Sequence, residues 1–276
     1  MMKRPFSVLM SLYYKEKAEY ADQCFQSLLA QTVPADEWVI VEDGPLTDEL
    51  YRLLETYEQQ YPKLIKRIPL KENQGLGLAL RNGVPQCSYE LIARMDTDDI
   101  ARNDRFEKQL KEFDDDPLLD LCGSHISEFE EDPQIIVAQR KVPLTEKEIR
   151  IYQRRRDAFN HVTVMYKKQA VLEAGNYQDC PLMEDTLLWA NMLKNNVKCK
   201  NIDDDLVYTR IGKGMYERRG GLAYYRKYKA GRKKVLDTGF ISLRDYYVTL
   251  AVQLVVAIIP GSIRGWIFRR LLHGNG

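Results

Sequence analysis

The stretch Leu91-Ile92-Ala93-Arg94-Met95-Asp96-Thr97-Asp98-Asp99-Ile100 changes character abruptly. A short apolar run, of the length expected for a buried strand, ends in three carboxylates. Carboxylates this close repel one another unless a positive group lies among them. A divalent cation is the usual solution, held by one or two carboxylates with substrate phosphates completing its coordination. The alternative is a solvated acidic turn at a strand end, and the stretch alone leaves both interpretations open.

The residues before this stretch alternate between short apolar runs and amphipathic segments. Strands are predicted at 6–10, 38–41, 64–68 and 91–95, with helices between them at 20–32, 46–57 and up to about 82. This cadence is typical of a parallel sheet covered by helices, in which ligands bind beyond the carboxyl ends of the strands. Polar groups follow three of those ends, at Ser11, Glu42-Asp43 and Asp96–Asp99. Their convergence favours a nucleotide-type ligand with a metal over a solvated turn.

The second half of the chain is less regular. Its apolar runs predict strands at 118–124, 135–138, 162–166 and 206–211, and helical spacing predicts a helix at 185–195. No internal repeat and no low-complexity linker divides the chain.

The composition is that of an ordinary folded protein with an uneven charge. The 276 residues, 45% hydrophobic and 29% charged, suit one large α/β domain or two small ones. The formal net charge is +1, yet residues 208 to 276 hold 14 Lys and Arg against 3 Asp and Glu. A basic tail on an acidic body predicts that the tail contacts an anionic surface. The five cysteines are scattered without a C-x-x-C pair, which argues against a zinc site and a disulfide framework and favours a reducing cytoplasm.

Four motifs, in this order, resemble the family-2 glycosyltransferases of the GT-A fold, in the form found in bacterial exopolysaccharide and capsule enzymes. They are Ser7-Val8-Leu9-Met10-Ser11 with Tyr13; Ser27-Leu28-Leu29-Ala30-Gln31-Thr32 followed by Val41-Glu42-Asp43-Gly44; Asn73-Gln74-Gly75-Leu76-Gly77-Leu78-Ala79; and Arg94-Met95-Asp96-Thr97-Asp98-Asp99 with Asp104-Arg105-Phe106-Glu107-Lys108-Gln109. Met183-Glu184-Asp185 and Leu188-Trp189 extend the resemblance, which covers about residues 6–220.

The resemblance implies an α/β fold with a Rossmann-like, mostly parallel central sheet and helices on both faces. It implies a GT-A catalytic domain over 1–220, in which 1–110 bind the nucleotide sugar and 111–220 bind the acceptor. Residues 221–276 follow as a helical, basic, amphipathic extension.

The residues assigned to the nucleotide are Ser11, Tyr13, Asp43, Asn73, Gly75, Arg81, Arg94 and Asp96. Glu42 departs from the family pattern, in which Asp is commoner, but Asp43 is the residue expected to face the base. Arg81 and Arg94 are candidates for phosphate contacts. The alternative for Arg94, which lies inside a strand, is a pair with an acidic side chain.

Sugar transfer from a nucleotide diphosphate needs charge stabilisation on the departing diphosphate, which a divalent metal supplies. Asp98, supported by Asp96, is predicted to hold Mn²⁺ or Mg²⁺. The resemblance leaves open that Asp96 or Asp98 binds the ribose instead. The alternative for Asp99 is to cap the following helix, where Asp is favoured.

The incoming hydroxyl must lose a proton, which takes a positioned base. By the resemblance this base is Asp185, with Glu184 beside it; the alternative is a residue favoured at a helix start by the helix dipole. One base, one metal and no obvious nucleophile imply single displacement with inversion. His161 is either a sugar or diphosphate contact or a structural histidine. Arg218 and Arg219 correspond to a basic loop over the diphosphate, or to a solvated charge cluster.

The tail contains an apolar run at 246–259, flanked by Lys and Arg. The run is shorter than the roughly 20 residues of a spanning helix. Apolar and aromatic residues among basic ones are typical of a helix lying in an anionic membrane surface. The alternative is a helix packed on the catalytic domain or on a partner subunit.

The sequence therefore predicts an inverting glycosyltransferase that uses a nucleotide diphosphate sugar, UDP-linked by expectation, and a divalent metal. Its acceptor would be a glycan or a polyprenyl-diphosphate-linked sugar of surface polysaccharide synthesis. It would be cytoplasmic, peripheral on the inner face of the cell membrane, without a nucleic-acid partner. The rival interpretations are a sugar-phosphate nucleotidyltransferase, disfavoured because 11–15 lack a glycine, and a non-catalytic membrane-surface binding module.

Overall fold

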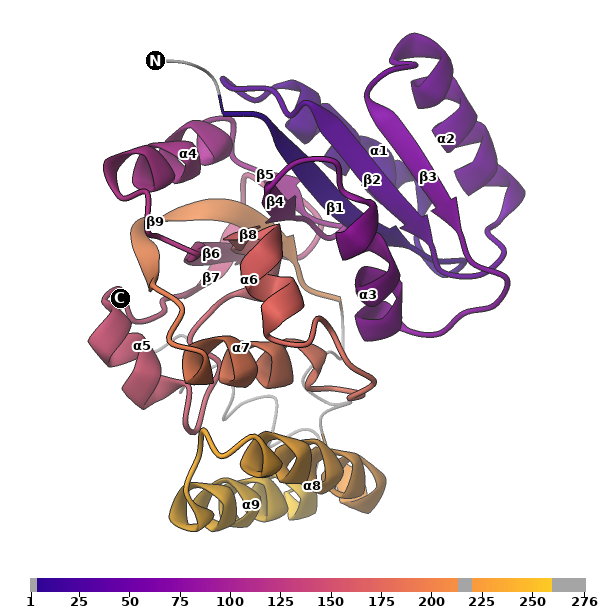
Figure 1. Cartoon of the computed structure of the whole chain (residues 1–276). Helices are drawn as coiled ribbons and strands as arrows, with labels where there is room; N and C mark the ends of the chain where they lie inside the picture. Colours follow the sequence, from indigo (N-terminus) through magenta and orange to yellow (C-terminus); the bar gives the residue numbers. More distant parts are fainter. Residues whose placement is uncertain (1–3, 213–219, 260–276) are drawn as a thin grey trace.

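A mixed β-sheet runs through the molecule, with helices packed on both of its faces (Figure 1). The computed structural model describes residues 4–212 and 220–259. In these residues the sheet has nine strands, in the order β3-β2-β1-β4-β8-β6-β9-β5, and β7 pairs with β6. The strands are β1 (Phe6–Leu12), β2 (Glu37–Glu42), β3 (Ile65–Pro69), β4 (Leu91–Arg94), β5 (Ile100–Ala101), β6 (Leu121–Phe129), β7 (Ile136–Arg140), β8 (Met165–Lys167) and β9 (Cys199–Arg210). The helices are α1 (Ala18–Leu29), α2 (Asp48–Gln60), α3 (Leu76–Gln86), α4 (Arg105–Asp115), α5 (Glu146–Tyr152), α6 (Lys168–Glu173), α7 (Glu184–Lys194), α8 (Gly221–Asp237) and α9 (Leu243–Ile258).

The first half of the sheet is parallel, as the sequence predicts. β1 pairs in parallel with β2 and with β4, and β2 pairs in parallel with β3. Side chains of successive strand residues point to opposite faces. On β1, Val8 packs in a cluster with Phe25 of α1, whereas Leu9 packs in a second cluster with Leu80 of α3. Both faces of the sheet are therefore covered by helices.

The second half of the sheet introduces antiparallel pairs. β8 is antiparallel to both β4 and β6, while β6 is antiparallel to β7 and parallel to β9. The predicted strand at 162–166 is wrong at its start, because His161–Thr163 forms a short 3₁₀ turn before β8. The predicted strand at 118–124 begins too early, since Leu118 is exposed and β6 runs from Leu121 to Phe129.

The strand register gathers the polar strand ends at one edge of the sheet. Ser11 lies opposite Val41, and Leu12 lies opposite Glu42. Leu9 lies opposite Arg94, so that Asp96 follows β4 at the same level. The loops after β1, β2 and β4 consequently meet, as the sequence predicts.

The last described segment is a hairpin of two helices, α8 and α9, beside α7 (Figure 1). α9 begins with a capping box, in which Ser242 Oγ accepts from the Asp245 backbone N–H and Asp245 Oδ2 accepts from Ser242 N–H. Val235 and Leu250 of the hairpin share an apolar cluster with Met183 and Leu187. One face of the hairpin is thus packed on α7 and the residue before it. No helix in the described ranges is long and apolar enough to cross a membrane.

Candidate active site

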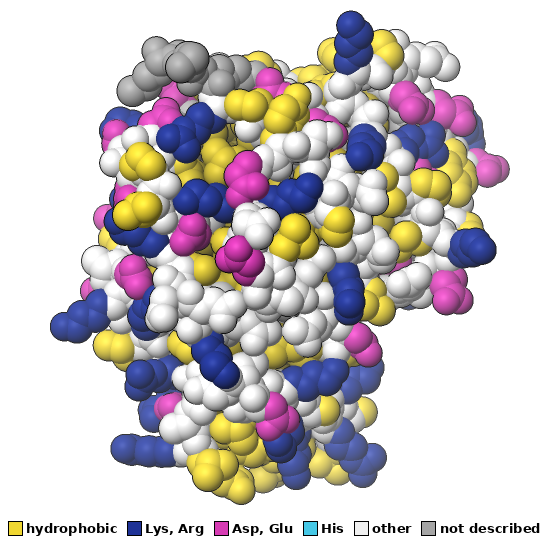
Figure 2. Space-filling model, in the orientation of Figure 1, with side chains coloured by type: hydrophobic (Ala, Val, Ile, Leu, Met, Phe, Trp, Pro, Cys, Tyr) yellow, Lys and Arg dark blue, Asp and Glu magenta, His cyan; other side chains and the backbone are white. Residues whose placement is uncertain are grey.

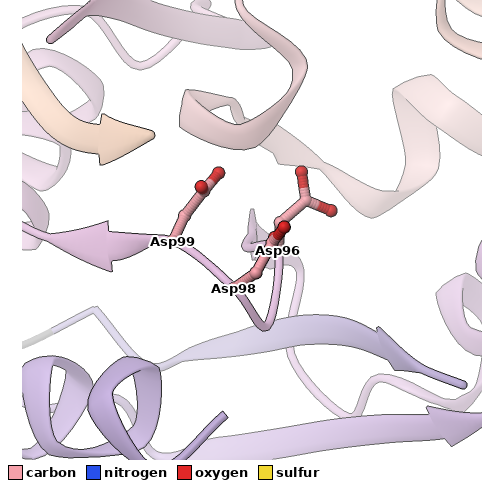
Figure 3. A group of neighbouring side chains, drawn as sticks. All are labelled: Asp96, Asp98 and Asp99. Carbon is pink, nitrogen blue, oxygen red and sulfur yellow. The ribbon is translucent and has the colours of Figure 1, made fainter. Parts of the chain in front are cut away.

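Three carboxylates gather in the loop between β4 and β5. Asp96, Asp98 and Asp99 each offer an oxygen within 4.8 Å of the others (Figure 3). A cavity of about 490 Å³ lies beside Asp98, and Tyr13 and Glu16 help to line it. Clustered carboxylate oxygens are the ligands that Mg²⁺ and Mn²⁺ prefer, so the donor set fits a divalent metal.

Arginines hold this acidic loop in place from two sides. Arg94, 1% exposed, donates from Nη1 to Asp96 Oδ2 at 2.5 Å and from Nη2 to the other oxygen. This confirms the pairing of Arg94 with an acid. On the other side, the backbone N–H of Arg210 donates to Asp99 Oδ1 at 2.7 Å, and Arg210 Nε donates to the Asp98 carbonyl at 3.2 Å. β9 therefore fixes the far end of the loop.

The helix-cap interpretation of Asp99 is wrong. The residues after Asp99 form β5, and α4 begins only at Arg105. Asp99 is 2% exposed and accepts a backbone hydrogen bond from β9 instead. Its role in the structure is to tie the acidic loop to the end of β9.

The acidic loop is electrostatically strained. Burial, with the nearby charges of Asp96 and Glu16, raises the pKa of Asp98 to about 7. Burial and the charges of Asp98 and Asp96 also hold the pKa of Asp99 well above its ordinary value. A bound divalent cation would relieve the repulsion that these shifts express.

Three of the residues assigned to the nucleotide build one connected turn. Asp43 accepts hydrogen bonds on Oδ1 from Gln74 N–H (2.7 Å) and on Oδ2 from Gly75 N–H (2.9 Å). Asn73 Nδ2 donates to the Asp43 carbonyl at 3.1 Å. Gly75 has φ +86°, a left-handed conformation that favours glycine. Asp43, 2% exposed, thus shapes the turn that opens α3.

The other nucleotide candidates, apart from Arg94 and Asp96 of the acidic loop, are Ser11, Tyr13 and Arg81. Ser11 is half-buried at the end of β1, and Tyr13 is exposed at the cavity beside Asp98. Arg81 is exposed on α3, where its carbonyl accepts from Asn176. Glu42, the departure from the family pattern, is buried and pairs with Arg67 of β3 at 2.5 Å. The longer side chain of Glu42 therefore forms an ion pair within the sheet.

Asp185 and Glu184 open α7, next to the start of α3. Asp185 Oδ1 accepts from Thr186 N–H at 2.7 Å. Burial, followed by the charges of Asp157 and Glu184, raises the pKa of Asp185 to about 8. Gly77 of α3 lies so close that a Cβ on it would be 2.7 Å from Glu184 Cβ. The proposed nucleotide turn and the proposed base are thus held together by direct helix contact.

His161 lies near Arg94 and packs against α7. Its Nε2 is 2.8 Å from the hydroxyl of Tyr177, and its ring lies edge-on to Trp189 with centroids 5.9 Å apart. Burial, with the positive charge of Arg94, holds the pKa of His161 well below its ordinary value. His161 is therefore a neutral, half-buried hydrogen-bonding group beside Arg94.

Four residues of this region belong to no motif in the sequence, and two of the predicted site residues lie outside the described part of the chain. Asp157, Arg210, Glu16 and Tyr177 carry no motif in the sequence, because their contacts come from distant segments. Arg218 and Arg219 lie outside the described residues.

All five cysteines are free and buried, which agrees with the absence of a disulfide framework.

Residues 7–174 match the sequence pattern of Glycosyl transferase family 2. The chain belongs to this family. It is accordingly a glycosyltransferase, which decides against a nucleotidyltransferase and against a non-catalytic binding module.

Relatives in this family match over nearly the whole chain. An uncharacterized glycosyltransferase of Haemophilus influenzae is 39% identical, covering 97% of this chain and 99% of its own length. The amylovoran biosynthesis glycosyltransferase AmsE of Erwinia amylovora is 35% identical, over 96% and 98%. The UDP-Gal:alpha-D-GlcNAc-diphosphoundecaprenol beta-1,3-galactosyltransferase of Escherichia coli is 33% identical, over 97% and 96%.

Solved structures share the fold. TarS 1-349 of S. aureus in complex with UDP-GlcNAc superposes with a TM-score of 0.62 at 18% identity, covering 97% of this chain and 72% of that one. The mannosyltransferase PcManGT of Pyrobaculum calidifontis, in complex with GDP-Man and Mn²⁺, gives 0.63 at 14% identity, over 92% and 70%. The family-2 chain therefore has the GT-A architecture that the sequence predicts.

Proposed function

We propose that this family-2 glycosyltransferase moves a sugar from a UDP-sugar to a hydroxyl of a lipid-linked glycan, with a divalent metal and with inversion. The observation that carries the proposal is the placing of two carboxylate groups on facing elements. One group, Asp96 and Asp98, lies at the end of β4, and the other, Asp185, lies at the start of α7. Glu184, next to Asp185, lies near enough to Asp96 and Arg94 for their charges to act on its carboxyl group and shift its pKa.

The acidic loop suits the donor diphosphate. Asp98, with Asp96 oriented by Arg94, would hold Mg²⁺ or Mn²⁺. When bound, such a cation supplies positive charge that stabilises the departing diphosphate. Asp43, Asn73 and Gly75 shape the turn expected beside the nucleotide, and Tyr13 lines the adjoining cavity.

Asp185 would act as the base. The acceptor oxygen forms a bond to the anomeric carbon while its proton passes to the Asp185 carboxylate. The bond from that carbon to the diphosphate oxygen breaks, and the diphosphate leaves with the electron pair. Attack from the face opposite the leaving group inverts the anomeric carbon. The raised pKa of Asp185 suits a proton acceptor.

The substrates are proposed from the relatives. The Escherichia coli relative is named for UDP-Gal and a diphosphoundecaprenol acceptor, and the Erwinia relative is named for amylovoran biosynthesis. A UDP-sugar donor and a diphosphate-lipid acceptor in polysaccharide synthesis are the corresponding proposal for this chain.

A lipid-linked acceptor fits the surface of the tail. The outer face of α9 exposes apolar residues along its length, at Leu243, Tyr247, Val252, Val255 and Ile258. Basic residues of α8 are exposed beside it, at Arg226, Lys227, Lys229, Lys233 and Lys234. At the end of the molecule formed by the hairpin, dark blue side chains surround a yellow patch (Figure 2). We propose that this face lies on the anionic inner surface of the membrane.

The Asp98→Ala variant tests the metal site that the donor requires. We expect Mn²⁺-dependent binding of UDP, measured by isothermal titration calorimetry, to weaken by more than about 100-fold, because changes even to residues behind a metal ligand cost 10–100-fold. Glu55→Ala, an exposed change on α2, is the control. Unchanged binding of UDP and Mn²⁺ by Asp98→Ala would remove the metal site from the proposal.

A further inference from the structure

Asp157 lies directly behind the start of α7. Its Oδ1 accepts from Thr186 Oγ1 at 2.6 Å and from Gln153 Nε2 at 3.2 Å, and its carbonyl accepts from Arg140 Nη2 at 3.0 Å. Thr186 in turn donates its backbone N–H to Asp185 Oδ1. Asp157 therefore holds the residue that orients the Asp185 carboxylate.

The loop that carries Asp157 is fastened to the C-terminal hairpin. Arg232 of α8 donates from Nη2 to the Arg154 carbonyl at 2.8 Å. Arg155 pairs with Asp245 of α9, with Nε and Oδ1 2.7 Å apart. The loop thus contacts the base helix on one side and both tail helices on the other.

Arg232 is a buried charge without a direct carboxylate partner among the described residues. It is 2% exposed, and its Nε has no hydrogen-bond partner in that part of the chain. A buried cation is costly unless nearby negative groups compensate it. The two carboxylates whose charges act on Arg232 are Asp157 and Asp245. Arg232 therefore faces the acid that lies behind the base.

The negative charge of Asp157 also repels the Asp185 carboxylate. Asp157 is the neighbour whose charge most raises the pKa of Asp185, after burial itself. A positive charge beside Asp157 offsets part of that repulsion.

We infer that Asp157 is the positioning residue of the base and that Arg232 supplies its counter-charge, so that the C-terminal hairpin is a working part of the active site. The inference rests on the assignment of Asp185 as the base. It gives the hairpin a second role besides contact with a membrane: α8 sets the strength of the base through the loop between them.

The charged and titratable groups around this chain of contacts come from every neighbouring element. Those that face Asp185 are Asp157, Glu184, Arg140 and Tyr177; those that face Asp157 are Tyr228 and Arg232 of α8, with Glu184 of α7 and Arg140 of β7. Of these, only Asp157 and Arg232 are changed in the test.

The test is the pH dependence of kcat/KM for sugar transfer. The deprotonated form of Asp185 is the active one, so the rate of the wild type rises with pH through about 8. Asp157→Asn removes a negative charge but keeps an acceptor for Thr186. We expect its rise in rate to move to lower pH by about one unit, because an adjacent like charge shifts a carboxyl pKa by that order.

Arg232→Gln has the opposite effect. Without the positive charge, Asp157 repels the base more strongly, and the rise in rate moves to higher pH, by less than the Asp157→Asn shift. Arg232→Lys restores the charge and returns the profile toward that of the wild type. Lys111→Gln is the matched control, since it removes an exposed charge of α4 that pairs with Asp115. Its profile should equal that of the wild type.

The outcomes separate this inference from the base assignment. If Asp157→Asn and Arg232→Gln lower kcat while both profiles keep the wild-type midpoint, the two residues are merely structural and the inference is overturned. If transfer survives in Asp185→Asn, the base assignment itself fails. Opposite shifts with restoration by lysine support the inference, and urea unfolding of each variant identifies any that fails to fold.

Discussion

At the scale of single residues, Asp185 combines burial with negative neighbours, and both make its carboxylate a stronger base. Its pKa of about 8 means that the unliganded protein holds the group largely protonated at neutral pH. As the proposed base, Asp185 must therefore lose a proton before it can accept one from the acceptor. The resulting rate should be low at acidic pH and should increase on the alkaline side.

Asp185→Asn tests the role directly, because asparagine keeps the size and cannot accept the proton. We expect kcat for transfer to fall by about 10²–10⁴-fold, the usual contribution of general base catalysis. UDP binding with Mn²⁺ should remain, because Asp185 lies on α7 and the proposed metal site lies in the loop after β4. Asp179→Asn, an exposed change before the same helix, is the control and should behave as the wild type. Transfer at the wild-type rate by Asp185→Asn would take the base role from this residue.

At the scale of elements, the start of α3 and the start of α7 form one unit. Gly77 permits their contact, because any Cβ there would meet Glu184 Cβ at 2.7 Å and the Gln178 carbonyl at 3.3 Å. α3 follows the Asp43–Gly75 turn, and α7 carries Asp185, the proposed base. We therefore expect the spacing of the proposed donor site and base to depend on this contact.

Gly77→Ala should push these helices apart. Alanine favours a helix by about 1 kcal/mol over glycine, whereas overpacking costs about 1–3 kcal/mol, so we expect a net loss of unfolding free energy. Urea unfolding measures that loss, and transfer assays should show a lower kcat. Asn82→Ala, on the exposed face of the same helix, is the control. A Gly77→Ala protein as stable and active as the wild type would show that the contact is not required.

Patterns in the sequence predict elements whose burial pattern is set by residues close together in the chain. The β1, β2 and β4 runs and their polar ends were predicted because burial and strand period act locally. The run Val162-Thr163-Val164 looks like a strand but turns, since Thr163 Oγ1 donates to the Asn160 carbonyl and Asn160 Nδ2 donates to the Ser124 carbonyl. Such side-chain bonds to backbone compete with strand pairing.

The contacts that complete the site are tertiary, and no local pattern in the sequence predicts them. Asp99 accepts from Arg210, a residue 111 positions away, and Asp157 accepts from Thr186 across 29 positions. α4 is a different case, because Phe106, Leu110 and Phe113 have the spacing that predicts an amphipathic helix, although charged residues separate them. Its prediction was within reach of the sequence.

At the scale of the whole molecule, part of the excess positive charge of the tail lies on one surface of the hairpin. Five basic residues are exposed on α8, beside the apolar outer face of α9, while the inner face of the hairpin packs against α7. The two alternatives for the tail are therefore compatible: the hairpin packs on the catalytic domain and still presents an apolar, basic-edged face. A lipid-linked acceptor held at a membrane would then meet the enzyme on the side where the base helix is supported.

Val252→Asp with Val255→Asp tests that face without disturbing the packed one, because both valines are exposed. Two carboxylates remove apolar contact and add repulsion from anionic lipids, so we expect co-sedimentation with phosphatidylglycerol-containing vesicles to fall to the level seen with neutral phosphatidylcholine vesicles. Binding by the wild type should also weaken as salt rises, because the exposed lysines of α8 are screened.

Ile151→Asp is the matched control, since Ile151 is equally exposed but lies on α5. It should bind vesicles as the wild type does. All three proteins should transfer sugar equally to a short water-soluble acceptor, because the changed side chains lie outside the proposed active site. Undiminished vesicle binding by the double variant would show that the outer face of α9 does not contact the membrane, and the lipid-linked acceptor would then have to reach Asp185 by another side of the protein.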